Sequence, residues 1–270
     1  MDTMRIRPPA VADMFYPGAP QTLAAEVAAM LAGAAPPDPS FTQPKALIAP
    51  HAGYIYSGPV AASAYALLAP YAATIRRVVL LGPCHRVAVR GLAVPYVQAF
   101  RTPLGDIPLD QEAIAAVLTL PQVIRHDAAH AQEHSLEVQL PFLQKVLDRF
   151  SLVPLAVGYA TADEVAEVLD LLWGGPETLI VVSSDLSHYH TYLDARQRDR
   201  HTVDEIARLH LLVDHEQACG ATPINGLIEV AQRRGLQPHL LDLRNSGDTA
   251  GDKSRVVGYA SFAFMEPGHA

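Results

Sequence analysis

The chain has 270 residues, of which 50% are hydrophobic and 18% are charged, and its formal net charge at neutral pH is −8. This composition is typical of a folded globular protein and argues against disorder. The net negative charge argues against the basic surface that binds nucleic acid and against a polybasic patch that binds an anionic membrane. We therefore expect neither partner.

The predicted elements alternate between helix and strand, which indicates an α/β protein. Pro141 should kink its helix or lie near the first turn. In chain order the pattern predicts a helix over 21–34, a strand over 45–49, a helix over 58–68, strands over 76–81 and 91–95, helices over 110–118 and 135–150, a strand over 152–157, a helix over 161–173, a strand over 178–183, helices over 194–212 and 223–234, and strands over 238–243 and 255–264.

We expect a single domain spanning residues 1–270, because no shift in composition suggests a boundary. Its sheet should be mixed but mostly parallel, with helices on both faces, since the two closing strands can pair antiparallel. No apolar run approaches the roughly 20 residues of a membrane helix. The N-terminus lacks the apolar stretch of a signal peptide, and Cys84 and Cys219 are too few for a disulfide scaffold. We therefore expect a cytoplasmic protein.

Polar motifs follow three of the predicted strands, and each of them contains a histidine. His51 follows strand 45–49, His85 follows strand 76–81, and Asp185 and His188 follow strand 178–183. Ligands of open α/β sheets bind at the carboxyl ends of strands. A lone histidine after a strand is more often a cap or a satisfied core group. Three such motifs together favour a pocket that binds a transition metal, for which neutral imidazole is the usual ligand.

The segment EHSLE, residues 133–137, permits two interpretations. In the first, the segment is an ordinary helix start, with Ser135 as the N-cap and the acidic side chains near the N-terminus of the helix. Alternatively it places His134 in the pocket, and we weigh the two equally for His134 while favouring a structural role for Glu137. His126 and His130 are expected on the surface or in a loop. The chain contains no Walker loop, no dinucleotide-binding glycine pattern, no H-E-x-x-H and no G-x-S-x-G.

Six ordered motifs together resemble the Memo family, which includes bacterial members called AmmeMemoRadiSam system protein B. The resemblance extends from about Arg7 to Phe262. The motifs are PHAGYIYSG (50–58), GPCHR (82–86), EHSLEVQLPFL (133–143), SSDLSHY (183–189), ACGATPI (218–224) and NSGDTAGDKSRVVGYASF (245–262).

The resemblance implies a fold like that of the LigB-type class III extradiol dioxygenases, which hold non-haem iron with two histidines and a carboxylate. His51 and His85 match the histidine ligands by motif. His188 matches the base-like histidine, with Asp185 beside it, and His134 matches the histidine of the EHS motif. We therefore expect His188, Asp185 and His134 to be the catalytic side chains.

The third metal ligand departs from the family pattern. Animal Memo proteins complete the site with a cysteine in the last loop, where this chain has Gly247-Asp248. Cys219 belongs to the separate ACGATPI motif and is not expected to replace it. We expect Asp248 as the third ligand, with Asp252 as the alternative, and a packing role for Cys84.

The resulting hypothesis is a dioxygenase-like oxidoreductase that uses Fe(II) on an unknown small molecule. The alternative is a non-catalytic metal-binding or partner-binding accessory protein, which the bacterial family name links to a radical-SAM protein. A metal-dependent hydrolase ranks last. Copper and zinc remain possible metals, and a homo-oligomer is possible.

Overall fold

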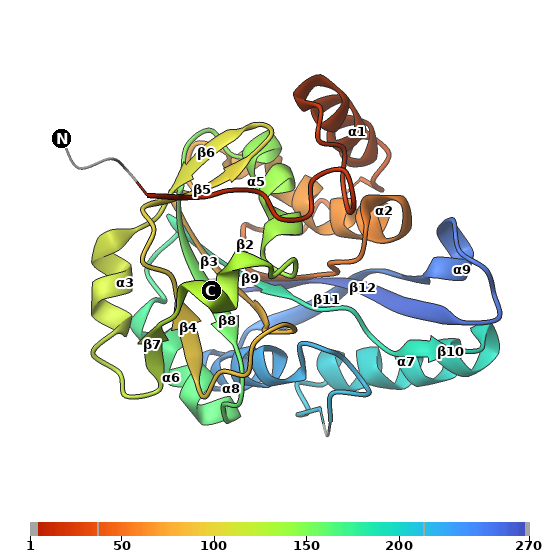
Figure 1. The fold of residues 1–270 in the computed structure, drawn as a ribbon. Helices are drawn as coiled ribbons and strands as arrows, with labels where there is room; N and C mark the ends of the chain where they lie inside the picture. The colour runs from red at the N-terminus through yellow and green to blue at the C-terminus, as the bar shows by residue number, and fades with distance from the viewer. Residues whose placement is uncertain (1–4, 37, 213, 268–270) are drawn as a thin grey trace.

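The computed structural model describes residues 5–36, 38–212 and 214–267. Within these residues the chain forms a large mixed sheet covered by helices, with a small three-stranded sheet beside it (Figure 1). The α/β class expected from the sequence is confirmed. The strands are β1 (Ile6–Arg7), β2 (Pro44–Ala49), β3 (Arg77–Pro83), β4 (Leu92–Val94), β5 (Ala99–Thr102), β6 (Gly105–Pro108), β7 (Val123–Arg125), β8 (Ser151–Val157), β9 (Thr178–Ser183), β10 (His188–His190), β11 (Gln237–Asn245) and β12 (Val256–Met265).

The helices lie on both faces of the large sheet. In Figure 1, α1, α2 and α5 lie above it, and α6, α7 and α8 lie below it. None of the helices in the described part of the chain combines the length and apolar character needed to cross a membrane. The α-helices are α1 (Pro20–Ala32), α2 (Tyr54–Tyr65), α3 (Gln111–Val117), α4 (Asp127–Ala131), α5 (Leu140–Val146), α6 (Ala162–Leu171), α7 (Tyr192–Ala207), α8 (Ala221–Arg234) and α9 (Ser246–Thr249), and short 3-10 turns are η1 (Ala66–Tyr71) and η2 (Glu137–Gln139).

The large sheet has the strand order β10-β12-β2-β9-β3-β8-β4-β7. In addition, β11 pairs with β12 along the edge opposite β2. Its centre is parallel, because β9 pairs in parallel with both β2 and β3, and β3 pairs in parallel with β8. The long strand β12 is antiparallel to β2, β10 and β11. The expected mixed sheet, with its two closing strands paired antiparallel, is thus confirmed.

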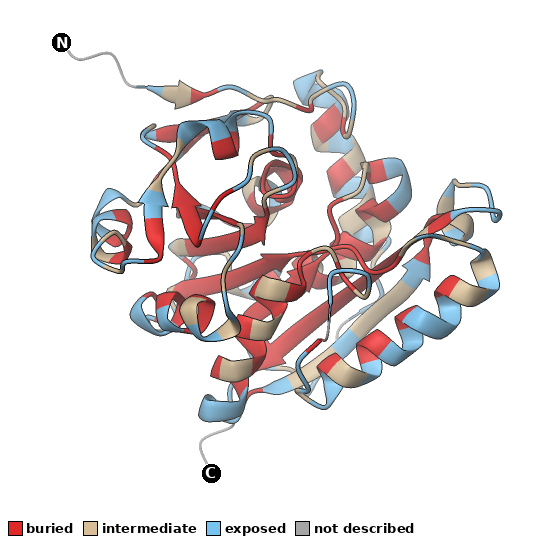
Figure 2. Cartoon of the chain, turned by 60° about the horizontal axis from the view of Figure 1, so that its bottom comes forward, coloured by how far each residue is buried: buried red, intermediate tan, exposed pale blue. Residues whose placement is uncertain are grey.

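The centre of the sheet is the core of the molecule (Figure 2). Strands β2 and β9 are buried along their whole length, and β3 and β8 are buried except at their first residue. A parallel sheet covered on both faces needs apolar residues at nearly every position, which is why these segments are continuous apolar runs.

The helix expected over 135–150 is shorter than its sequence pattern suggested. The α-helix begins at Leu140 with Pro141 in its first turn, and a 3-10 turn precedes it. Proline is tolerated there because the first amides of a helix have no intrahelical partner. The residues before it are therefore free to adopt a loop, and that loop carries His134.

The topology brings three sequence motifs to one edge of the sheet. Strands β2, β9 and β3 are adjacent and parallel, so their carboxyl ends meet. The residues that follow these ends are His51, Asp185 and His85.

Candidate metal centre

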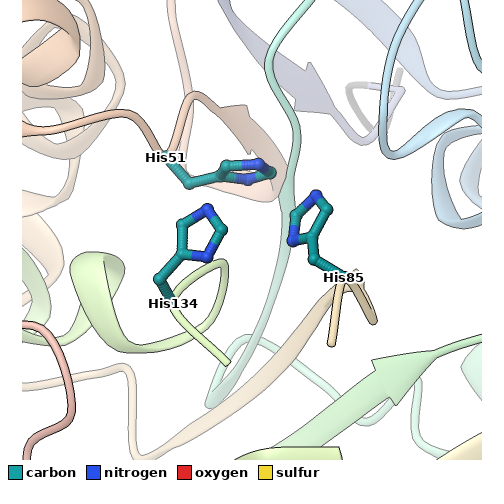
Figure 3. Close-up of side chains that lie close together, drawn as sticks. All are labelled: His51, His85 and His134. Atoms are coloured by element: carbon teal, nitrogen blue, oxygen red, sulfur yellow. The ribbon is translucent and has the colours of Figure 1, made fainter. Parts of the chain in front are cut away.

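Three histidines from three separate segments converge at this edge. His51, His85 and His134 each offer one ring nitrogen, and these nitrogens lie within 4.8 Å of one another. Figure 3 shows the three rings facing a common centre. The rings of His85 and His134 stack with centroids 4.8 Å apart, and the His51 ring is nearly perpendicular to both. Imidazole nitrogens grouped in this way form a donor set that suits a transition metal.

His51 is held in one orientation by the last residue of β9. Its Nδ1 lies 2.9 Å from the hydroxyl oxygen of Ser183. That hydroxyl donates its one proton to the carbonyl of Ser135 at 2.6 Å, so towards His51 it must accept. The proton of His51 therefore sits on Nδ1, and the lone pair of Nε2 is left for a ligand.

His85 is oriented in the same way by a buried carboxylate. Its Nδ1 lies 2.9 Å from Glu133 Oε1, and its backbone amide donates to Glu133 Oε2 at 2.6 Å. Burial raises the pKa of Glu133, but the hydrogen bonds and charge of His85 and the amide of Ser135 outweigh it and lower this pKa to about 2. An ionised carboxylate only accepts, so His85 carries its proton on Nδ1 and leaves Nε2 free.

His134 contributes the third ring, against which Phe15 packs at a centroid distance of 4.8 Å. Its Nδ1 is buried and has no hydrogen-bond partner among the described residues, although Glu133 Oε1 lies 3.4 Å away. Buried polar atoms are rarely left unpaired, so this nitrogen fits a site that takes a further ligand.

Burial keeps the rings of His51 and His134 neutral. Burial lowers the pKa of His51 to about 3, with a smaller contribution from His85. Burial likewise lowers the pKa of His134 to about 4, and His51 adds to the effect. Neutral imidazole is the form that binds a metal, so these two rings need no deprotonation near neutral pH.

Asp185 lies at the edge of the cluster, as the sequence suggested. It is buried, it accepts a 2.7 Å hydrogen bond from the backbone amide of His51, and its other oxygen is 4.0 Å from His51 Nε2. Burial raises the pKa of Asp185. His188 is outside the group of three rings, but it lines a cavity of about 420 Å³ with His134, Asp185 and Asp252.

Asp248 is not brought to the cluster. Its carboxylate accepts hydrogen bonds from the backbone amide of Asn245 and from the hydroxyl of Tyr192. It thereby caps the short helix α9 and lines a different cavity of about 360 Å³. Asn245 is the N-cap residue of α9, and the side chain of Asp248, three residues later, is occupied by accepting from the amide of Asn245 in a capping box.

Cys219 was not expected to replace the cysteine of the last loop as a metal ligand, but the structure places it beside His51. Its Sγ is 3.3 Å from His51 Nε2. Burial raises the pKa of this thiol to about 12, and the nearby carboxylate of Asp185 contributes. Gly220, the next residue of the ACGATPI motif, packs against Ser184, because a Cβ at this glycine would lie 2.7 Å from the side chain of Ser184.

Two further expectations concern the helix-start segment. Glu137 is structural, as expected: it is fully buried and accepts hydrogen bonds from Arg7 and from the hydroxyl of Tyr16. His130 is buried rather than exposed, so that expectation is wrong. Its side chain packs inside the fold, where a hydrogen bond of 2.9 Å between its Nε2 and the carbonyl oxygen of Ala93 satisfies this polar atom.

A second cavity reaches the cluster from His85. It has a volume of about 470 Å³ and is lined by Cys84, His85 and Cys219 together with apolar residues such as Val87 and Val157. Cys84 is half-buried with its Sγ 3.0 Å from the carbonyl of Val87, which is consistent with a packing role.

The fold and this cluster define an α/β protein with a three-histidine site that could hold a metal. A model of the Memo-like protein family matches residues 7–263. The chain is 36% identical to a MEMO1 family protein of Aquifex aeolicus, over 97% of this chain and all of the relative. It is 35% identical to one of Sulfolobus acidocaldarius, over 96% and 99%, and 37% identical to one of Methanosarcina acetivorans, over 96% and 98%. The chain belongs to the Memo family.

Proposed function

We propose that this protein is a metal-dependent oxidoreductase whose centre is formed by His51, His85 and His134. The observation that carries the proposal is the convergence of three imidazole nitrogens within 4.8 Å. Two of these rings have their second nitrogen fixed by Ser183 and Glu133. Such outer hydrogen bonds orient the ligands of metal sites.

The donor set fits iron, zinc and copper, and the family resemblance favours iron. His134 takes the place in this proposal that the sequence had assigned to Asp248. The thiol of Cys219, 3.3 Å from His51 Nε2, is a further donor within reach. When bound, Fe(II) would supply open coordination positions for redox chemistry on a small organic molecule.

The surrounding side chains suit proton handling. Asp185 holds the backbone of His51, and His188 lines the cavity that opens on His134. We assign His188 the role of general base toward a substrate in that cavity, because its imidazole lines the cavity and can accept a proton from a ligand bound there. Asp185 positions His51 and supplies negative charge beside it.

Oxygen uptake tests the proposal. Iron-loaded and zinc-loaded protein would be incubated with a panel of small phenols and carboxylic acids, and dissolved oxygen would be followed with an electrode. We expect uptake with at least one compound for the iron form alone. His188→Gln should lower the rate at least about a hundredfold, whereas His215→Gln, which alters the second cavity, should not.

The alternatives predict different results. Substrate cleavage by the zinc form without oxygen uptake would replace the proposal with a hydrolase. An iron form that consumes oxygen with no member of the panel would favour the accessory role linked to a radical-SAM protein.

A further inference from the structure

The cavity beside His134 contains a cation that the proposed chemistry does not use. Arg255 lies directly before β12 and lines this cavity of about 420 Å³. Among the described residues, it is the only arginine or lysine that lines the cavity. No ion pair joins Arg255 to a carboxylate among the described residues. Its guanidinium is therefore available to a ligand.

The local backbone holds this arginine against an aromatic ring. The Arg255 guanidinium carbon lies 5.1 Å from the ring centre of Tyr189, an arrangement that favours a cation. Tyr189 has a φ of 62°, a left-handed conformation that is strained for a tyrosine. Tyr189 lies in β10, directly after His188, which pairs with Val257 of β12. Strain of this kind persists only where the surrounding structure imposes it, and it is concentrated at ligand sites.

The other walls suit a flat organic molecule. Phe15, Tyr56 and Tyr259 contribute aromatic surface, and His134 and His188 contribute imidazole rings. A cavity of this size is in the range that binds small ligands.

Two carboxylates also face the cavity, and each has a partner within the protein. Asp185 accepts from the amide of His51, and Asp252 accepts from the amide of Ser254. Their negative charge opposes an incoming anion. A divalent metal at the three histidines would offset that charge, so anion binding should strengthen when the metal is bound.

We propose that this cavity binds a small aromatic carboxylate, with its carboxylate paired to Arg255 and its ring between the aromatic walls. A guanidinium matches a carboxylate through two parallel hydrogen bonds, which an uncharged amide cannot reproduce. The inference deepens the proposed function by naming a substrate class. The inference depends on the proposed function in one respect only, namely that the end of the ligand away from its carboxylate points towards His134.

The test compares benzoate with benzamide, its uncharged analogue, by titration calorimetry on metal-free and iron-loaded protein. The wild-type protein should prefer benzoate at least tenfold, and more strongly when loaded. Arg255→Ala should abolish this preference while leaving benzamide binding within twofold, and Arg255→Lys should retain part of it. Arg255 is exposed, so folding should not be affected.

Arg86→Ala is the matched control, because Arg86 is an exposed arginine that lines the second cavity. Loss of the preference in Arg86→Ala, or an unchanged preference in Arg255→Ala, would overturn the inference. Absence of any preference in the wild-type protein would do the same. Inorganic phosphate that binds more tightly than benzoate through Arg255 would overturn the carboxylate assignment. Failure to take up iron while the Arg255-dependent preference persists would count against the proposed function alone.

Discussion

Asp199 is a buried carboxylic acid in α7, close to the segment that carries His188. It is 2% exposed, and its carboxylate accepts a 3.0 Å hydrogen bond from the amide of Ser187. Gly258 lies against it, because a Cβ at that glycine would come within 2.0 Å of the carboxylate. Burial raises the pKa of Asp199 from 3.8 to about 6, although the hydrogen bonds from Ser187 act in the opposite direction.

This shift predicts a pH-dependent stability. The folded state holds the proton more tightly than the unfolded state, so the stabilisation is complete below pH 3.8 and is lost as the pH rises through about 6. The loss amounts to about 3 kcal/mol. Asp199→Asn should remove it, so the free energy of unfolding of the variant relative to wild type should rise by that amount between pH 4 and pH 7.

Urea unfolding across this pH range measures the effect. Asp204→Asn, an exposed change on the same helix, should show no such trend. If the difference in the free energy of unfolding between Asp199→Asn and wild type does not vary with pH, then the pKa of Asp199 is not raised in the folded protein.

Single residues of the site were predictable to different degrees. His51 and His85 could be identified because each directly follows an apolar strand, and the structure brings both to one centre. Asp248 was misleading, because a carboxylate in a loop has the same sequence signature whether it binds a metal or caps a helix, as it does here. Cys219 could not be placed, since its approach to His51 depends on how α8 packs, which no local pattern encodes.

Among the elements, the junction between β8 and the loop after β3 determines the shape of the second cavity. Gly158 follows β8, and a Cβ there would lie 2.1 Å from the carbonyl oxygen of Val89. The next residue, Tyr159, donates its amide to that same carbonyl at 2.8 Å. The two segments therefore approach each other only because residue 158 has no side chain.

Gly158→Ala should consequently push the loop away from β8 and destabilise the protein by about 2 kcal/mol or more. Thermal or urea unfolding would measure the change. Gly33→Ala, at the end of α1, is the control, because its nearest atom would be 3.4 Å away and its φ is −84°. Equal stability of Gly158→Ala and wild type would indicate that the loop and the strand separate without cost.

The long elements were predictable, whereas most of the short strands were not, β4 being an exception. Strands β2, β3, β8 and β9 are apolar because both faces of the sheet are covered, so their sequences identify them. The strands β1, β5, β6, β7 and β10 have two to four residues each, too few for a periodic pattern. Their existence depends on tertiary pairing, as with β10, which within the described residues joins the sheet through β12 alone.

At the scale of the whole molecule, the centre connects parts of the chain that are far apart in sequence. His51 follows β2, His85 follows β3, and His134 lies in the loop before α5, whose Glu137 anchors Arg7 near the N-terminus. The three histidines come together only in the folded state. A metal bound to them would therefore stabilise the entire fold, by about 2.7 kcal/mol when its concentration is a hundred times its Kd.

Metal content, determined by mass spectrometry on anaerobically purified protein, tests the central claim most directly. The proteins to compare are the wild type, His51→Ala, His85→Ala, His134→Ala and, as a control away from the cluster, Asp248→Ala. We predict near-stoichiometric iron in the wild type and in Asp248→Ala, and its loss in each histidine variant. A wild-type protein that takes up no iron, copper or zinc, or iron that survives in His134→Ala but not in Asp248→Ala, would contradict the account.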